Sequence, residues 1–450
     1  MNLGFLTVLP IIVMVVLVVT TKKVFEPLIV SVVLVFIFKD GTGFLTGIID
    51  AIYEVFAGDT YPWVLLMLTL FGALIQLLLE SNAVAGFRGM ALKFIKSERS
   101  SLIFTWVLGV ILCIDDYIND LAIGPSIRSI TDKYKVPREA IGFIILAMGI
   151  PICALLPISA MAVFVCGVMQ ETGISAPDAN MLSEYIKLMP FLVYPMMIVL
   201  MALLFAIGIV PKIGPIKKLY AQRDEIFKDA ALTEASDSDE EGQGESEGNL
   251  LDFIIPVLVV VGVMVVTRDL VVSVTCALAA CFVLYIPRKK MTVDEFFKNI
   301  FEGIHSMIDI LVILLFVFVF VEGLTQIGIG EYVIGTVTPF LTGGVIPMLT
   351  FIVVALLVFG GVDYWAVILL VAPITVPLAA TFGVDQYLTM AAVVSGSICG
   401  GTSCFFSEQM LMCSQAVEKD SVSLARVAFP YSLICFVLTA IVYGVLGFVL

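Results

Sequence analysis

A short polar segment in the first half of the chain carries the side chains best suited to chemistry. Residues 113–121 read Cys-Ile-Asp-Asp-Tyr-Ile-Asn-Asp-Leu, within an otherwise apolar stretch. A carboxylate at membrane depth is costly, so acids found there usually face a cavity and mark a path for ions or protons. Hard cations prefer oxygen ligands. We therefore expect a cation and proton site that includes Asp115, Asp116, Asn119 and Asp120.

The spacing of these residues predicts how they could work together. In a helix over 115–120, Asp116 and Asp120 would share one face, because residues four apart are neighbours. Two adjacent carboxylates repel each other, so one of them should hold a proton near neutral pH. A site that exchanges a proton for a cation needs that property. We expect Na⁺ itself at Asp115, Asp116 and Asn119.

Two segments that break a helix lie at matching places in the two halves. Residues 149–159 carry Pro151 and Pro157, and proline both removes a donor and clashes with the preceding turn. The freed carbonyls need a partner, which a bound cation can supply. Residues 395–407 offer glycines and hydroxyls instead. A simple kink, or helix packing through small residues, is the alternative interpretation.

The breaks extend the expected sites. Pro151 and Ser159 join the cation and proton site of the first half. In the second half we expect a second ion or substrate site, composed of Asp363, Ser395, Ser397, Thr402, Ser403, Ser407 and Glu408. Arg128 and Asp132 stand four residues apart, which suits an internal ion pair in the first hairpin; direct binding of an anionic substrate is the other possibility.

The composition requires that these residues sit in membrane-spanning helices. Of 450 residues, 60% are hydrophobic and 14% are charged, against about 45–50% and 25% in soluble domains. Apolar runs long enough to cross a bilayer recur along the chain. This predicts an all-α polytopic membrane protein. The nine cysteines show no paired spacing, so neither a disulfide framework nor a zinc site is expected.

The chain divides into two halves with the same order of elements. Ser159 ends the first break and Ser407 the second, an offset of 407 − 159 = 248 residues, and Asp116-Tyr117 recurs as Asp363-Tyr364. Each half is expected to hold about five transmembrane helices, one of them interrupted, and a re-entrant hairpin. The expected boundaries are a first repeat at 1–213 (hairpin 101–131, interrupted helix 139–168), a linker at 214–250, and a second repeat at 251–450 (hairpin 344–381, interrupted helix 386–414).

The distribution of charge predicts the orientation. The linker is acidic, rich in serine and glycine and poor in hydrophobic residues, which is typical of disorder. If it is cytoplasmic, 20 of the 24 Lys and Arg residues lie on the cytoplasmic side, as the positive-inside rule requires. An odd number of crossings per half then inverts the second half relative to the first. Both termini should face outward across the cell membrane.

These motifs resemble those of a known family. The first-half pattern Gly109, Asp115-Asp116-Tyr117, Gly124, Arg128, Thr131-Asp132, Arg138-Glu139, Pro151 and Pro157-x-Ser159 is similar to the signature of NhaC-type Na⁺/H⁺ antiporters. The resemblance implies secondary active transport coupled to Na⁺ or H⁺, with each hairpin tip meeting an interrupted helix. One departure is clear, because Gly400-Gly401-Thr402 stands where the family typically has Gly-Asp-His.

The sequence therefore predicts a Na⁺/H⁺ antiporter that works by alternating access. The alternative is Na⁺- or H⁺-coupled transport or exchange of a small organic solute, an amino acid or a carboxylate such as malate or lactate. No ring-forming selectivity motif supports a channel, and no catalytic motif supports an enzyme. The expected partners are the lipid bilayer, Na⁺, H⁺ and a second copy of the chain, with no nucleic acid and no cofactor.

Overall fold

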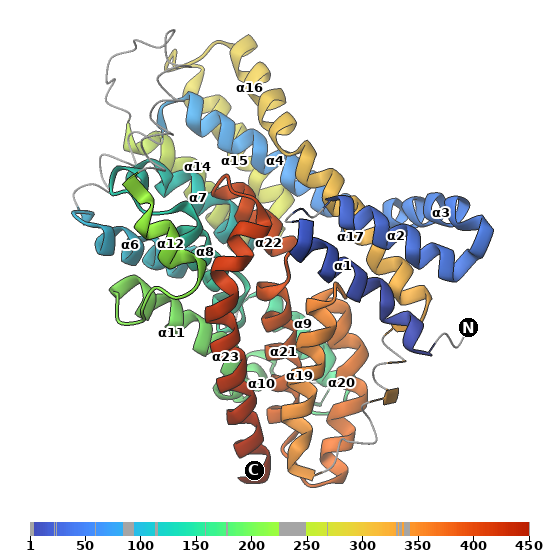
Figure 1. The fold of residues 1–450 in the computed structure, drawn as a ribbon. Helices are drawn as coiled ribbons and strands as arrows, with labels where there is room; N and C mark the ends of the chain where they lie inside the picture. Colours follow the sequence, from blue (N-terminus) through green and yellow to red (C-terminus); the bar gives the residue numbers. More distant parts are fainter. Residues whose placement is uncertain are drawn as a thin grey trace.

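The protein is an all-α membrane protein. The computed structural model describes residues 4–449 except 22, 24, 59, 84–93, 113–115, 158, 177–178, 225–248, 268, 330–331, 333–334 and 337–342. Every regular element in the described part of the chain is helical, as expected from the composition. The helices and the order in which they follow the chain are shown in Figure 1.

The first half contains two groups of helices. The first group is α1 (Leu9–Thr21), α2 (Phe25–Asp40), α3 (Phe44–Ala57) and α4 (Thr60–Glu80). The second group is α6 (Glu98–Ile111), α7 (Asp116–Lys133), α8 (Arg138–Ala154), α9 (Ala160–Glu171), α10 (Met181–Leu188), α11 (Val193–Ile207) and α12 (Pro215–Ala221).

The second half repeats this order. Its first group is α14 (Leu250–Thr267), α15 (Leu270–Tyr285), α16 (Val293–Ser306) and α17 (Ile308–Gln326). Its second group is α19 (Ile346–Phe359), α20 (Tyr364–Thr381), α21 (Gln386–Ser403), α22 (Glu408–Ala416) and α23 (Ser421–Val449). Of the linker expected to be disordered at 214–250, residues 225–248 lie outside the described residues, whereas Pro215–Ala221 form α12, so the linker was predicted to begin too early.

Within each half the second group packs in the same way. In the first half, α6 contacts α7 and α8, and α8 contacts α7 and α11. In the second half, α19 contacts α20 and α21, and α21 contacts α20 and α23. The helices α7 and α20 therefore hold equivalent places, as do the broken pairs α8–α9 and α21–α22.

The contacts between the two halves are reciprocal. Helix α17 packs against α2 and α3, while α4 packs against α15 and α16. Helix α7 packs against α22, while α20 packs against α9. Helix α8 packs against α23, α21 packs against α11, and α11 and α23 pack against each other. This exchange is the pattern expected when an approximate two-fold axis relates the halves, and it supports the proposed repeat.

By length and composition, four of the described helices can cross a membrane, and seven spans result if each sharply bent pair counts as one. The Gln386–Ser403 and Glu408–Ala416 segments form one such pair, bent by 45°. Helix α20 is by itself long and apolar enough to cross, so the re-entrance of the second hairpin stays a prediction. Helix α3 follows α2 after the short 3₁₀ turn Gly41–Gly43, in which Gly41 has a positive φ.

Candidate functional site

The polar residues of the first half and the break of the second half meet between α7 and α22. Tyr117 Oη donates a hydrogen bond of 2.8 Å to Glu408 Oε1. Further along the same helix pair, a Cβ built on Gly124 would lie 2.3 Å from the carbonyl oxygen of Ala416. The contacts advance in the same direction along both helices. The first turns of α7 and α22 therefore lie at one end of the pair.

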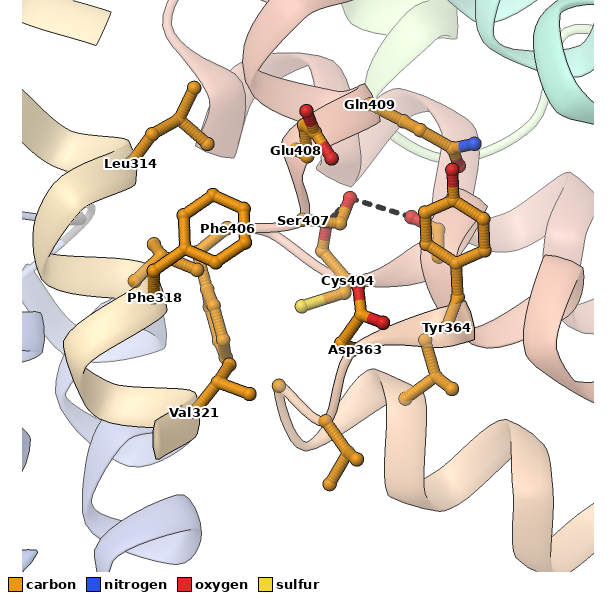
Figure 2. Close-up of a pocket in the computed structure, with 15 residues that line it drawn as sticks. Leu314, Phe318, Val321, Asp363, Tyr364, Cys404, Phe406, Ser407, Glu408 and Gln409 are labelled. Carbon is orange, nitrogen blue, oxygen red and sulfur yellow. Dashed lines mark hydrogen bonds between the residues drawn. The ribbon is translucent and has the colours of Figure 1, made fainter. Parts of the chain in front are cut away.

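A small cavity opens beside this end. It has a volume of about 50 Å³ and lies between α17 and the segments around the starts of α20 and α22. Figure 2 shows its polar side, where Asp363, Ser407, Glu408 and Gln409 are grouped. The opposite wall is apolar and is made by Leu314, Phe318, Val321 and Phe406.

Helix α20 brings a second acid and a tyrosine to the same place. Asp363 is the N-cap of α20, where its Oδ1 accepts hydrogen bonds from the backbone N–H groups of Trp365 at 3.0 Å and Ala366 at 2.8 Å. The next residue, Tyr364, lines the same cavity as Asp363 and Glu408. Through the hydrogen bond from Tyr117 to Glu408, the start of α7 joins the second hairpin and the second break at this cavity. The sequence predicted two separate sites.

Two further first-half residues are buried along α7, Asn119 against α6 and Asp120 against the break of α8. Asn119 is fully buried, and its Nδ2 donates to the carbonyl oxygen of Gly109 at 2.8 Å. Its Oδ1 has no hydrogen-bond partner among the described residues. Asp120 lies against Gly149, where a Cβ would be only 2.3 Å from Asp120 Oδ1. Gly149 has non-helical torsion angles and precedes Pro151, so the kink makes room for the carboxylate.

The two break serines begin helices. Ser159 Oγ accepts from the N–H of Ala162 at 3.2 Å and caps α9. Ser407 Oγ accepts from the N–H of Met410 at 3.2 Å and caps α22, and it donates to the carbonyl oxygen of Gly401 at 2.6 Å. N-capping satisfies one of the free donors at a helix start. Ser407 also lines the cavity, so it contributes to the site as well as to the fold.

Other hydroxyls predicted for the second site point elsewhere. Ser395 Oγ accepts from Tyr443 Oη at 2.7 Å, and Thr402 Oγ1 shares a 2.9 Å hydrogen bond with Tyr194 Oη. Ser397 Oγ donates to a carbonyl oxygen of its own helix, and Ser403 lines a different hollow beside α23. Serine and threonine hydroxyls are suitable ligands for an ion or a substrate. Three of these hydroxyls, however, already form hydrogen bonds within the protein. Of the second-site residues, Asp363, Ser407 and Glu408 reach the cavity.

The predicted ion pair between Arg128 and Asp132 is replaced by a longer network. Arg128 pairs with Glu418, and Arg138 pairs with Glu418 at 2.9 Å and with Asp132 at 2.9 Å. Spacing of four residues allows Arg128 and Asp132 to meet, but Glu418, at the end of α22, comes within reach of both arginines. The network ties α7, α8 and the end of α22 together. None of its members lines the cavity.

Three residues near the cavity were not predicted from the sequence. Tyr117 and Tyr364 recur after an aspartate in both halves, and that repetition was a usable signal. Gln409 had no signal beyond its place after Glu408. Asp115 lies outside the described residues. Among the described residues, no three His, Cys, Asp or Glu side chains converge as in a protein metal centre, so Na⁺ at Asp115, Asp116 and Asn119 stays a prediction.

The counterpart of this site in the other half is apolar. The offset that relates Ser159 to Ser407 places Ala160 and Met161 opposite Glu408 and Gln409. Where α7 continues from Asp116-Tyr117 with Ile-Asn-Asp, α20 continues from Asp363-Tyr364 with Trp-Ala-Val. At the α20–α9 contact, Trp365 packs edge-on against Phe164, with ring centroids 4.7 Å apart. Among the described residues, carboxylates and amides gather at the α7–α22 contact, whereas the ring contact between α20 and α9 is apolar.

Comparison with known proteins supports a transporter. Residues 246–448 match the model of the Na⁺/H⁺ antiporter family, which confirms the resemblance over the second half. An uncharacterized protein of Haemophilus influenzae is 23% identical over 423 residues, covering 86% of this chain and 78% of that protein. The family match supports a secondary transporter of the membrane and gives no indication of an enzyme.

Two solved structures are also similar. The YdaH transporter of Alcanivorax borkumensis is 13% identical, with a TM-score of 0.38, over 90% of this chain and 88% of that one. MtrF of Neisseria gonorrhoeae, described within a class of antimetabolite efflux pumps, is 15% identical, with a TM-score of 0.36, over 91% and 85% of the two chains.

Proposed function

We propose that the protein is a Na⁺/H⁺ antiporter in which the acid cluster at the starts of α7, α20 and α22 binds Na⁺ and H⁺ alternately. The observation that carries the proposal is the pair of acids Asp363 and Glu408 beside one small cavity, with Glu408 hydrogen-bonded to Tyr117 at the start of α7, in the other half of the chain. The match of residues 246–448 to the antiporter family supports the same activity.

A simple charge count explains why such a cluster would exchange cations. Each helix start carries roughly half a positive charge, so the starts of α7, α20 and α22 together contribute about +1.5. Three ionised carboxylates contribute −3, which leaves about −1.5 in a largely apolar setting. One bound Na⁺ or one proton brings the sum to about −0.5. Either cation offsets the same negative charge. Binding one of them therefore weakens the binding of the other.

The arrangement of the halves supports alternating access. Secondary transporters with inverted repeats place their sites near the repeat interface, at broken helices, and expose them to each side in turn. Here α7 belongs to the first half and α22 to the second, so relative movement of the halves would open or close the α7–α22 contact. The hydrogen bond between Tyr117 and Glu408 crosses this boundary.

The alternative substrate, a small organic solute, receives less support from the geometry. Pockets for organic ligands usually have volumes of about 300–1,000 Å³, whereas the cavity here has about 50 Å³. Thr402, which made the second site look suited to a solute, is bonded to Tyr194 and does not line the cavity. The size of the cavity suits a cation and a few water molecules.

Transport by purified protein in liposomes tests the proposal. An outward or inward Na⁺ gradient is imposed, and the internal pH is followed with a trapped dye. Proton movement opposite to Na⁺, with no organic solute present, is the expected result. The same measurement is repeated with a panel of amino acids and small carboxylates. Proton movement that begins only when one of these is added would overturn antiport and select the solute-coupled alternative.

A further inference from the structure

Gln409 is a buried amide for which the fold supplies no partner. Its side chain is 5% exposed, and neither Nε2 nor Oε1 has a hydrogen-bond partner among the described residues. Leaving a buried polar group unpaired is costly, so such groups in native proteins usually have a role or an additional partner. Both polar atoms of the Gln409 side chain are buried without a hydrogen-bond partner among the described residues. A purely structural role does not explain this.

The position of Gln409 indicates where that partner would be. Gln409 lines the same cavity as Asp363, Ser407 and Glu408, and directly follows Glu408 in the first turn of α22 (Figure 2). An amide can direct its oxygen into the cavity while its NH₂ group faces a neighbouring acceptor.

The neighbouring backbone leaves room for the amide. A Cβ built on Gly401 would lie 3.0 Å from Gln409 Oε1. Gly401 is in the last turn of α21 and does not have a positive φ. No unusual backbone conformation requires glycine here. A side chain at position 401 would crowd the amide of Gln409, so the glycine leaves room for that amide. Met161 takes the equivalent place in the first half, where the matching contact is apolar.

We propose that Gln409 is a ligand of the transported Na⁺, and that its amide oxygen lets the site distinguish Na⁺ from a proton. This inference rests on the proposed function. A proton needs only a carboxylate oxygen, whereas a hard cation needs several oxygen ligands at once. Glu408 and Asp363 can serve either ion. The amide oxygen of Gln409 serves only Na⁺, because it is neutral and does not take up a proton at physiological pH.

Equilibrium binding of radioactive Na⁺ to the purified full chain in detergent tests this role, together with Na⁺-dependent thermal stabilisation. The variants are Gln409→Leu, which removes the amide, and Gln409→Asn, which shortens it. Gln415→Leu is the matched control on the same helix, since Gln415 donates to the carbonyl oxygen of Ser306 and does not line the cavity. We expect both Gln409 variants to weaken Na⁺ binding at least about tenfold, and the control to bind as the wild type does.

The outcomes separate this inference from the proposed function. If the wild type binds Na⁺ and both folded Gln409 variants bind it equally well, the amide serves a water molecule and the inference is overturned. If the wild type neither binds Na⁺ nor is stabilised by it, the proposed function itself fails. If Gln409→Leu does not fold, Gln409→Asn decides the question, because it keeps a polar amide in the same helix turn.

Discussion

At the scale of single residues, the site depends on a few polar groups placed where water is scarce. Asp363 and Glu408 line the cavity and Asp116 begins α7, while Asn119 and Gln409 supply buried amides whose oxygens have no hydrogen-bond partner among the described residues. The residue types alone do not explain this role. The side chains must also be buried beside the cavity and keep an oxygen available to an ion. Thr402 and Ser395 have equally suitable oxygens, but each is bonded to a tyrosine in the core and is not available to an ion.

Replacing Tyr117 with phenylalanine tests the contact between the halves. The change removes the donor to Glu408 and keeps the ring that packs on Trp63. A hydrogen bond to a charged group contributes about 1.5–3 kcal/mol, and about 1.4 kcal/mol is a factor of ten in rate. We expect Na⁺-driven proton flux in liposomes to fall about tenfold or more. The control is Tyr53→Phe, since Tyr53 is 70% exposed; equal losses in both variants would contradict the assignment.

At the scale of elements, the site requires α7 and α22 to approach closely and to begin side by side. The sequence allowed the prediction of the acidic segment and of both breaks, because charge, proline and clustered glycine stand out in an apolar chain. It did not allow the prediction of which helices meet. Arg128 pairs with Glu418 instead of Asp132, and Tyr117 meets the break of the other half. Such contacts join residues nearly 300 positions apart.

Substituting Gly124 tests the close approach. A methyl group there would overlap the carbonyl oxygen of Ala416, so Gly124→Ala must push α7 and α22 apart. Overpacking of this kind costs about 1–3 kcal/mol, and we expect a lower melting temperature together with reduced flux. Gly167→Ala in α9 is the control, because a Cβ there meets nothing within 4 Å. A Gly124→Ala protein with wild-type melting temperature and flux would show that the two helices need not be this close.

At the scale of the whole molecule, the two halves provide two equivalent helix contacts, α7–α22 and α20–α9. We propose the transport site at the first of them. The reciprocal packing of α7 with α22 and of α20 with α9 shows that the fold offers two equivalent places. Polar residues occupy the first place, and Trp365 and Phe164 occupy the second. This changes the interpretation drawn from the sequence, in which each half kept its own site.

The inverted arrangement of the halves predicts a specific topology. If each half contributes an odd number of crossings, as the sequence predicts, a cytoplasmic linker at 214–250 places both termini outside. We expect green fluorescent protein inserted in the linker to fluoresce, and the same protein fused after Leu450 to stay dark. Alkaline phosphatase fused after Leu450 should be active. Fluorescence from the fusion after Leu450 would exclude the inverted arrangement.

The most direct measurement of the central claim is Na⁺-driven proton flux by the wild type, Asp116→Asn and Glu408→Gln in liposomes without organic solute. Glu302→Gln is the matched control, because Glu302 forms an exposed ion pair with Lys298 on α16. We predict flux for the wild type and the control, and only the leak of empty liposomes for the two cluster variants, with all four proteins folded. Undiminished flux in Glu408→Gln or Asp116→Asn would contradict the assignment of the acid cluster as the exchange site.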